Sequence, residues 1–199
     1  MANEYATSAE LKATLSLSSE SFADADIALA LTAASRAIDS VCDRRFWADA
    51  DATQVRYYSP IDGRRVWTDD IVTLTSFQTD PGGDGTFEET WTLNTDFTLE
   101  PLNAAADGWP WTSVRVHPRT AFYLPITYPR SVKVTGKFGW SAVPDAVKQA
   151  TKIVAAKLVM RARQAPFGVI AAGELPMRIA SNDPDVQLLI GDYVRANHS

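Results

Sequence analysis

Very few side chains in this sequence have the types and spacing that catalysis or metal binding requires. The two histidines, His117 and His198, have no cysteine or second histidine at the spacing of a zinc site. The motifs of a serine nucleophile, a zinc protease and a phosphate-binding loop do not occur. The 24 acidic residues could include an acid and base pair for hydrolysis, but nothing singles out two of them. The sequence therefore predicts no catalytic residue, no metal site and no cofactor.

The acidic, glycine-rich segment 80–89 is the one stretch that suggests a cation site. It contains four carboxylates, Asp80, Asp84, Glu88 and Glu89. Their spacing does not match the calcium loop of an EF-hand. Its glycines supply the positive φ angles that tight turns need, so the segment is predicted to be a hairpin tip.

The six tryptophans suggest a second kind of site, because exposed tryptophan is frequent in binding surfaces. A row of exposed indole rings would favour a carbohydrate-binding module. The interpretation we favour is that Trp91, Trp109, Trp111 and Trp140 close the core of a small sheet.

The clearest structural element is the segment 24–45, which has the period of an amphipathic helix. Its apolar side consists of Ile27, Ala30, Leu31, Ala34, Ala37, Ile38, Val41 and Cys42. The small residues on this side would let another helix approach closely. Leu29 points away from it. The segment is therefore predicted to pack on helices, with one apolar side chain left on its outer surface.

Further helices are predicted at both ends of the chain. A capping box formed by Thr7 and Glu10 starts a short helix that ends near Leu15. A second helix runs from Pro144 to about Arg163, and a third begins at Asp183 and Pro184. The segment between them, 164–182, contains prolines and glycines and is predicted to be a long functional loop.

Two cations, Lys157 and Arg161, fall inside the apolar arc predicted for the helix 144–163. Buried without partners they would cost several kcal/mol, so they must reach solvent, pair with carboxylates or face another subunit. Asp39 and Asp43 are candidate partners within the chain.

The central part of the chain has the period of two that is typical of strands. Short strands are predicted at 53–59, 71–77, 91–93, 97–99, 114–116 and 131–138. The predicted fold is α+β: a helical bundle of two long amphipathic helices and short terminal helices, with an inserted antiparallel sheet or sandwich. We place the helical body at 1–51 and 141–199 and the β-rich insertion at 52–140, because no flexible linker flanks the insertion.

Composition excludes several classes of protein. With 199 residues, 46% of them hydrophobic, the chain is long enough for a sizeable core. A net charge of −5 and the lack of a basic run argue against a protein that grips nucleic acid. The single cysteine, Cys42, permits no intrachain disulfide. There is no signal peptide or membrane-spanning run, so we expect a protein made and assembled in a cytoplasm.

Several blocks, taken in order, resemble the head-to-tail connector (adaptor) proteins of long-tailed bacteriophages. They are SAELKATLSL, ALTAASRAIDSVCDRRFW, FGWSAVPDAVKQATKIVAAKLVMRARQAPFG and NDPDVQLLIGDYVR. The Arg-Arg-Phe-Trp and Gly-Trp-x-x-Val-Pro junctions add to the match.

The resemblance implies a structural virion protein of a phage or of a related gene transfer agent. Such a protein would form a ring in the neck, with twelve copies expected, dock on the portal protein and link it to tail-completion and tail proteins, while DNA passes through the bore. It would not be an enzyme. Candidate residues for contacts with other subunits or the portal are Leu29, Arg36, Lys157, Arg161, Phe167, Arg178 and Tyr193.

Three alternatives remain open at this point. A tail-completion protein of the same neck is the nearest. The others are a carbohydrate-binding module that uses the tryptophan-rich β region, and a small hydrolase that uses a pair of carboxylates.

Overall fold

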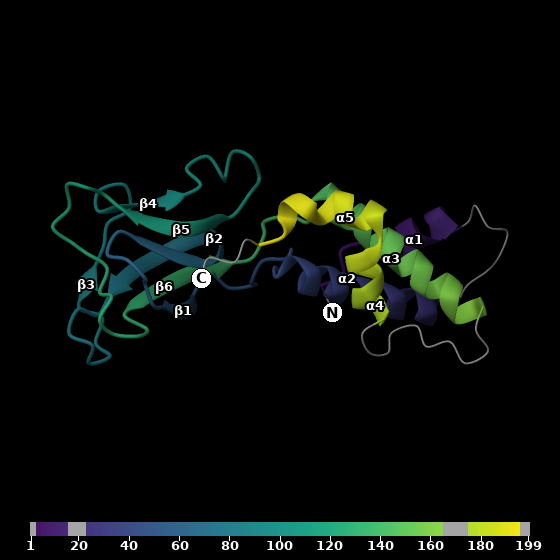
Figure 1. Cartoon of the computed structure of the whole chain (residues 1–199), viewed down its shortest axis with the longest axis horizontal. Helices are drawn as coiled ribbons and strands as arrows, with labels where there is room; N and C mark the ends of the chain where they lie inside the picture. Colours follow the sequence, from purple (N-terminus) through teal and green to yellow (C-terminus); the bar gives the residue numbers. More distant parts are fainter. Residues whose placement is uncertain (1–2, 16–22, 165–174, 196–199) are drawn as a thin grey trace. The chain divides into compact units, whose positions relative to one another are not determined.

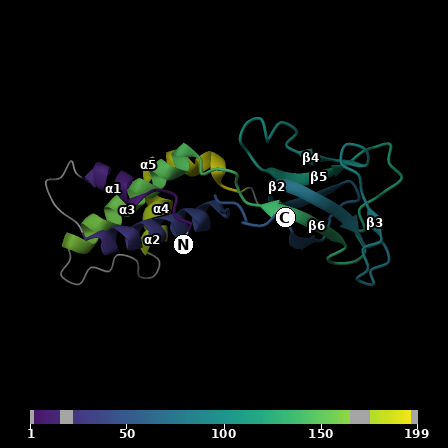
Figure 2. The same cartoon turned by 180° about the vertical axis from the view of Figure 1, so that it is seen from behind.

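The computed structural model of the chain describes residues 3–15, 23–164 and 175–195. Over these residues the protein is α+β, with five α-helices, one short 3-10 helix and a six-stranded antiparallel sheet. The described residues divide into two compact units. The helical unit lies within Met1–Phe46 and Val143–Asn197, and the β unit lies within Trp47–Ala142. Figures 1 and 2 show the helices and strands of each unit from opposite sides.

The helical unit contains α1 (Ser8–Leu15), α2 (Asp24–Cys42), α3 (Asp145–Gln164), α4 (Leu175–Asn182), α5 (Pro184–Ile190) and the 3-10 helix η1 (Gly191–Tyr193). The predicted capping box starts α1, because the Thr7 N–H donates to Glu10 Oε2 and the Glu10 N–H donates to Thr7 Oγ1. Helix α3 contacts each of the other four α-helices and is the centre of the unit.

The apolar side predicted for α2 is confirmed, except that Val41 is only half-buried. The helix ends at Cys42, three residues earlier than predicted. Asp43 adopts a left-handed φ of 48°, and its N–H donates to the carbonyl of Asp39. This conformation satisfies an otherwise free carbonyl and turns the chain out of the helix.

The buried stripe of α3 differs from the predicted arc. Its fully buried residues are Val147, Ala150, Thr151, Val154, Ala155, Leu158 and Val159. They recur at intervals of three and four, which places Lys157 at the edge of the stripe. Arg161 continues the stripe three residues after Leu158, where burial has ended, and both cations are exposed. The prediction that Lys157 lies in the apolar arc was therefore wrong, whereas Arg161 lies on the arc but beyond its buried part.

The segment 164–182 is not a loop throughout, because α4 occupies its last part. Residues 165–174 lie outside the described residues. Proline is tolerated in the first turn of a helix, and Pro176 is buried there together with Ala180 one turn later. The prediction took the prolines and glycines of this segment as signs of a loop and so missed a short helix that packs against α2, α3 and α5.

The β unit is one sheet made of β1 (Gln54–Tyr58), β2 (Arg65–Thr79), β3 (Glu89–Thr90), β4 (Phe97–Glu100), β5 (Trp111–Val116) and β6 (Val132–Phe138). The strand order is β1-β6-β2-β5-β4, and β3 pairs with β2. Of the two predicted forms, sheet or sandwich, the described residues form a single sheet. Strands β1 and β4 are its edges.

Two predicted strands need correction. Segment 71–77 is part of the longer β2, which continues through irregular pairing between Trp67 and Ile71. Segment 91–93 is not a strand: Leu93 forms only an isolated bridge with Phe97. Asn94, with φ of 65°, turns the chain directly after it.

One face of the sheet carries the core of the β unit. Its buried aromatic side chains are Phe77, Trp91, Phe97 and Phe138, which pack with the buried valines of β5 and β6. The alternation along β6 is complete: every second residue from Val132 to Phe138 is buried. The residues between them, on the other face of β6, are half-buried.

Candidate interaction site

The N-terminal segment is fastened to α2 by a network around Tyr5, which is buried. The Tyr5 hydroxyl donates to Asp39 Oδ1 and accepts from the N–H of Phe46 at 2.9 Å. The Tyr5 N–H donates to Ser35 Oγ at 3.1 Å. Arg36 pairs with Asp39 at 3.2 Å and donates from Nη2 to the carbonyl of Asn3. The network joins the N-terminal segment to the second half of α2 and, through Phe46, to the chain that follows the helix.

This arrangement changes the interpretation of Arg36. The side chain was a candidate for contacts with another subunit, but the structure places it over the Tyr5 ring, 5.5 Å from its centroid. No local sequence signal predicts this network, because Tyr5 and Asp39 are 34 residues apart.

Burial raises the pKa of the Asp39 carboxyl to about 6, although the Tyr5 hydroxyl and the charge of Arg36 lower it. An unfolded aspartate has a pKa of about 3.9, so the folded chain binds this proton more tightly between about pH 4 and pH 6. The stability that it contributes is present below about pH 4 and is lost as the pH rises through about 6.

We therefore expect the helical unit of the wild-type chain to lose stability relative to Asp39→Asn when the pH is raised from 4.5 to 7.5. Asparagine keeps an acceptor for the Tyr5 hydroxyl but does not titrate. The measurement is urea unfolding followed by ellipticity at 222 nm. An equal difference between the two chains at both pH values would contradict the expectation.

Lys157 has an intrachain partner that the sequence analysis did not identify. Its Nζ pairs with the carboxylate of Asp183, not with Asp39 or Asp43, the predicted partners. The Asp183 side chain is almost fully buried, at 4% exposure, and it also caps α5 by accepting from the N–H groups of Asp185 and Val186. The ion pair therefore holds the start of α5 against α3.

Replacing Asp183 by alanine is expected to destabilise the helical unit by about 2 kcal/mol, because the cap and the ion pair are both lost. Asp183→Asn keeps the capping oxygen and should cost less than half as much. Both values come from urea unfolding at 222 nm. Equal losses in the two variants would show that the cap contributes little.

The remaining candidate residues lie in different surroundings. Leu29 is 49% exposed, which confirms that it points outward. Arg161 and Arg178 are exposed and form no ion pair with a described residue. Tyr193 is half-buried, and its ring meets the Phe46 ring edge-on at 5.8 Å. Phe167 lies outside the described residues. Of the described residues, Leu29 lies on α2, Arg161 on α3, Arg178 on α4 and Tyr193 in η1.

The acidic segment that follows β2 is organised by one buried carboxylate. Asp80 Oδ1 accepts from the N–H of Gly83 at 2.6 Å, and its Oδ2 accepts from the N–H of Gly85 at 2.8 Å. Both glycines have positive φ. Asp80 thus serves as the acceptor that shapes the turn. In the described part of the chain, no group of three or more His, Cys, Asp or Glu side chains is placed to hold a metal ion.

None of the six tryptophans is exposed. Trp91 packs in the core against Phe77, and Trp140 donates from Nε1 to the buried Asp70 at 3.0 Å. Trp109 packs against Trp140, with ring centroids 5.0 Å apart. The row of exposed rings that a carbohydrate-binding face would present is therefore missing.

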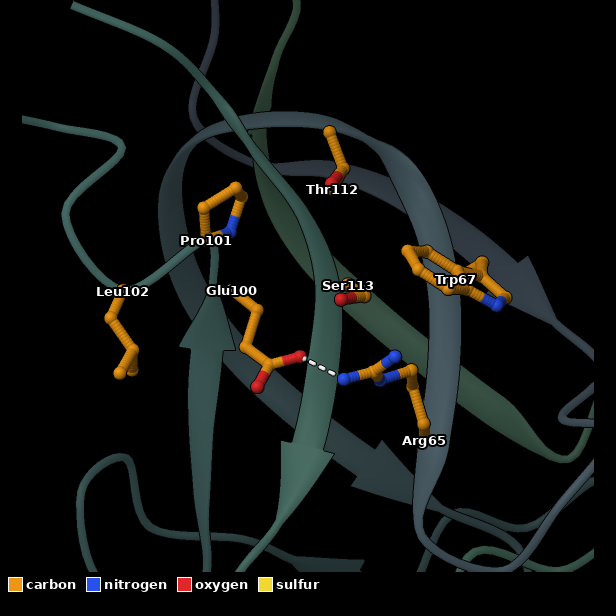
Figure 3. A pocket seen from close by; sticks show the side chains of 7 residues that line it. All are labelled: Arg65, Trp67, Glu100, Pro101, Leu102, Thr112 and Ser113. Carbon is orange, nitrogen blue, oxygen red and sulfur yellow. Dashed lines mark hydrogen bonds and ion pairs between the residues drawn. The ribbon is translucent and has the colours of Figure 1, made fainter. Parts of the chain in front are cut away.

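A shallow depression of about 220 Å³ lies on the outer face of β2, β4 and β5. In Figure 3 the side chains of Arg65 and Glu100 point toward each other across it, and Trp67 lies beside Arg65. Arg65 Nη2 donates to Glu100 Oε2 at 2.6 Å, and the guanidinium is 5.1 Å from the Trp67 ring. The volume is below that of most ligand pockets, and its charged groups already satisfy each other. It does not define a ligand site.

The described helices include none that is long and apolar enough to span a membrane. Neither a protein-family model nor a curated protein matches the sequence.

Solved structures do match, over nearly the whole chain. One similar chain comes from the neck of an empty gene transfer agent (GTA) particle computed with C6 symmetry. Its TM-score is 0.53 at 19% identity, and the match covers 98% of this chain and 93% of that one. Another comes from the neck of a native GTA particle computed with C12 symmetry. Its TM-score is 0.50 at 19% identity, and the match covers 100% and 98% of the two chains.

These matches define the class of fold: a helical unit interrupted by an antiparallel sheet, in the order found here. The structural neighbours of this chain are thus chains of GTA necks, consistent with the resemblance to head-to-tail connectors.

Proposed function

We propose that this chain is a structural subunit of the neck that joins the head of a phage or GTA particle to its tail. The observation that carries the proposal is the extent of the likeness to chains of GTA necks. It spans both units and almost the full length of both partners. The role is structural rather than catalytic, and its place is the assembled virion.

In this proposal, copies of the chain form a closed ring through heterologous contacts, in which one surface of each copy meets a different surface of the next. The C6 and C12 symmetry of the similar necks supports a ring, with twelve copies as the expected number. The ring docks on the portal protein and binds tail-completion and tail proteins on its other side. DNA passes through the bore, and the net charge of −5 means that it is not held there by phosphate contacts. Assembly takes place in the cytoplasm of the host, without a cofactor.

The proposal also distinguishes this chain from a tail-completion protein of the same neck. An adaptor contacts the portal directly, whereas a tail-completion protein contacts the adaptor. Purified portal rings should therefore bind the full-length chain in the absence of other neck proteins. Binding that requires a second neck protein would instead assign the chain to tail completion.

Deleting the gene for this chain in cells that produce the particles tests the proposed role. We expect DNA-filled heads and separate tails, because the two structures would lack their connection. A copy of the wild-type gene supplied on a plasmid should restore joined particles. Fully joined particles in the deletion strain would overturn the proposal.

A further inference from the structure

The outer face of the sheet near the β1 edge carries a basic and apolar patch. Val55 and Tyr57 of β1 are 44% and 42% exposed. Tyr57 lies opposite Lys133 in the register, and Val55 lies opposite Thr135, so Lys133 and Lys137 of β6 share this face. Neither lysine forms an ion pair with a described residue, although the β unit contains more acidic than basic residues. We call these four side chains, Val55, Tyr57, Lys133 and Lys137, the β1–β6 patch.

The Tyr57 ring of this patch and the neighbouring Phe87 ring each contact a cation. The Arg130 guanidinium lies 4.6 Å from the Tyr57 ring centroid, and Lys133 Nζ lies 5.5 Å from the Phe87 ring centroid. The Tyr57 and Phe87 rings are themselves 5.6 Å apart. These contacts hold the positive charges beside the exposed side chains of Val55 and Tyr57.

The helical unit carries a surface with the opposite charge pattern. Leu188 of α5 is 87% exposed, more than any other large hydrophobic side chain in the described part of the chain. Asp185 lies three residues before it and Asp192 four residues after it, so the three share one side of α5 and η1. Both aspartates are exposed, and neither forms an ion pair with a described residue. We call Asp185, Leu188 and Asp192 the α5 stripe.

The two surfaces match in order and in spacing. Four strand positions separate Lys133 from Lys137, a distance of roughly 13 Å along β6. Seven helical positions separate Asp185 from Asp192, a distance of roughly 11 Å. Each surface has an apolar centre between its two charges. Long lysine side chains can accommodate the remaining difference.

We infer that the β1–β6 patch of one copy binds the α5 stripe of the next copy. This inference rests on the proposed function and adds a subunit contact to it. The contact is heterologous, because the patch and the stripe are different surfaces, and repeated contacts of this kind close a ring. Leu188 would lie against Val55 and Tyr57, and each aspartate would pair with one lysine.

Nucleic acid is a poorer match to the same patch. Proteins that hold DNA through its phosphates use about six to ten cationic contacts, and binding weakens as fewer phosphates are neutralised. The patch and the neighbouring Arg130 supply three cations on a unit with an excess of acidic residues. The Tyr57 ring and the neighbouring Phe87 ring already contact cations, whereas base stacking needs free ring faces. Tyrosine and arginine are instead enriched at protein interfaces.

Two matched variants test the contact in particle-producing cells that lack the wild-type gene. The patch-reversed variant is Lys133→Glu with Lys137→Glu, and the stripe-reversed variant is Asp185→Lys with Asp192→Lys. Each variant alone should enter purified particles at least about tenfold less than wild type, because both charge pairs become repulsive. Arg119→Glu with Lys152→Glu makes the same change in net charge as the patch-reversed variant, at positions outside the patch, and should enter normally.

The decisive step is to produce the two variants together. In a ring of alternating copies, the unchanged patch of one variant meets the unchanged stripe of the other, and the reversed patch meets the reversed stripe. Entry should therefore return to within about twofold of wild type. Rescue by mixing also shows that both variants fold. Rescue only when all four substitutions lie in one chain would mean a contact within the chain, and would overturn the inference. Normal entry of either variant alone would overturn it as well.

The outcomes also separate this contact from the proposed function. Absence of the wild-type chain from purified particles would refute the neck role itself. If the wild-type chain is present and only the patch-reversed variant enters poorly, the patch binds a partner other than the α5 stripe. A loss of duplex DNA binding in that variant would identify this partner as nucleic acid.

Discussion

Replacing Gly139 by alanine is expected to destabilise the β unit by about 3 kcal/mol or more. The residue has a φ of +106°, which L-residues rarely adopt. An added Cβ would lie 2.0 Å from the carbonyl oxygen of Trp47, which is backbone and has little freedom to move. Gly139 also donates its N–H to the carbonyl of Asp70 at 2.8 Å. Strain and steric overlap each cost on the order of 1–3 kcal/mol.

The tryptophans make the measurement specific to one unit. All six lie within 47–142, so their fluorescence reports on the β unit alone. Gly108→Ala is the matched control, because Gly108 has a φ of +74° and open space where the Cβ would be. It should cost about 1 kcal/mol from conformation only. Equal losses in the two variants would show that the close approach to Trp47 is unimportant.

Phe46→Ala is expected to have the largest effect in the helical unit, about 4 kcal/mol. The side chain is fully buried. Its ring meets the rings of Tyr5 and Tyr193 edge-on, both at 5.8 Å. Removing it leaves a cavity between the N-terminal segment and the end of η1, and it withdraws apolar contact from both.

Ellipticity at 222 nm during urea unfolding measures this loss, and the tryptophan fluorescence transition should stay unchanged. Leu29→Ala is the control. That side chain lies on α2 of the same unit but is 49% exposed, so its loss should cost less than about 1 kcal/mol. A Phe46→Ala loss as small as that of Leu29→Ala would contradict the packing described here.

Periodicity and caps predict the helices of this chain well because they are local signals. The apolar side of α2 from Ile27 to Cys42, the capping box at Thr7 and the cap at Asp183 can all be read from residues a few positions apart. The α+β class follows from the change of period after Trp47. The predicted boundaries at 51/52 and 140/141 compare with a division at 46/47 and 142/143 in the structure.

What the sequence does not predict depends on distant parts of the chain. The partner of Lys157 lies 26 residues away, and the partner of Tyr5 lies 34 residues away. Strand order is equally non-local, since β1 pairs with β6, the last strand. Helix α4 was missed because its stability comes from packing against α2, α3 and α5, not from its own composition.

The candidate interface residues show the same limit. The position of Leu29 on a helical wheel identifies it as an outward apolar side chain. The same method does not distinguish Lys157, which has an intrachain partner, from Arg161, which has no described partner. The α5 stripe was also missed. Its signal, an exposed leucine between two aspartates on one side of a helix, becomes visible only once the burial of Val186 and Ile190 fixes which side of α5 faces solvent.

Electron cryomicroscopy of purified particles tests the neck role most directly. We expect density for this fold as a closed ring between the portal and the tail, with twelve copies around the channel. A neck that is fully accounted for by other proteins, with no density for this chain, would contradict the account.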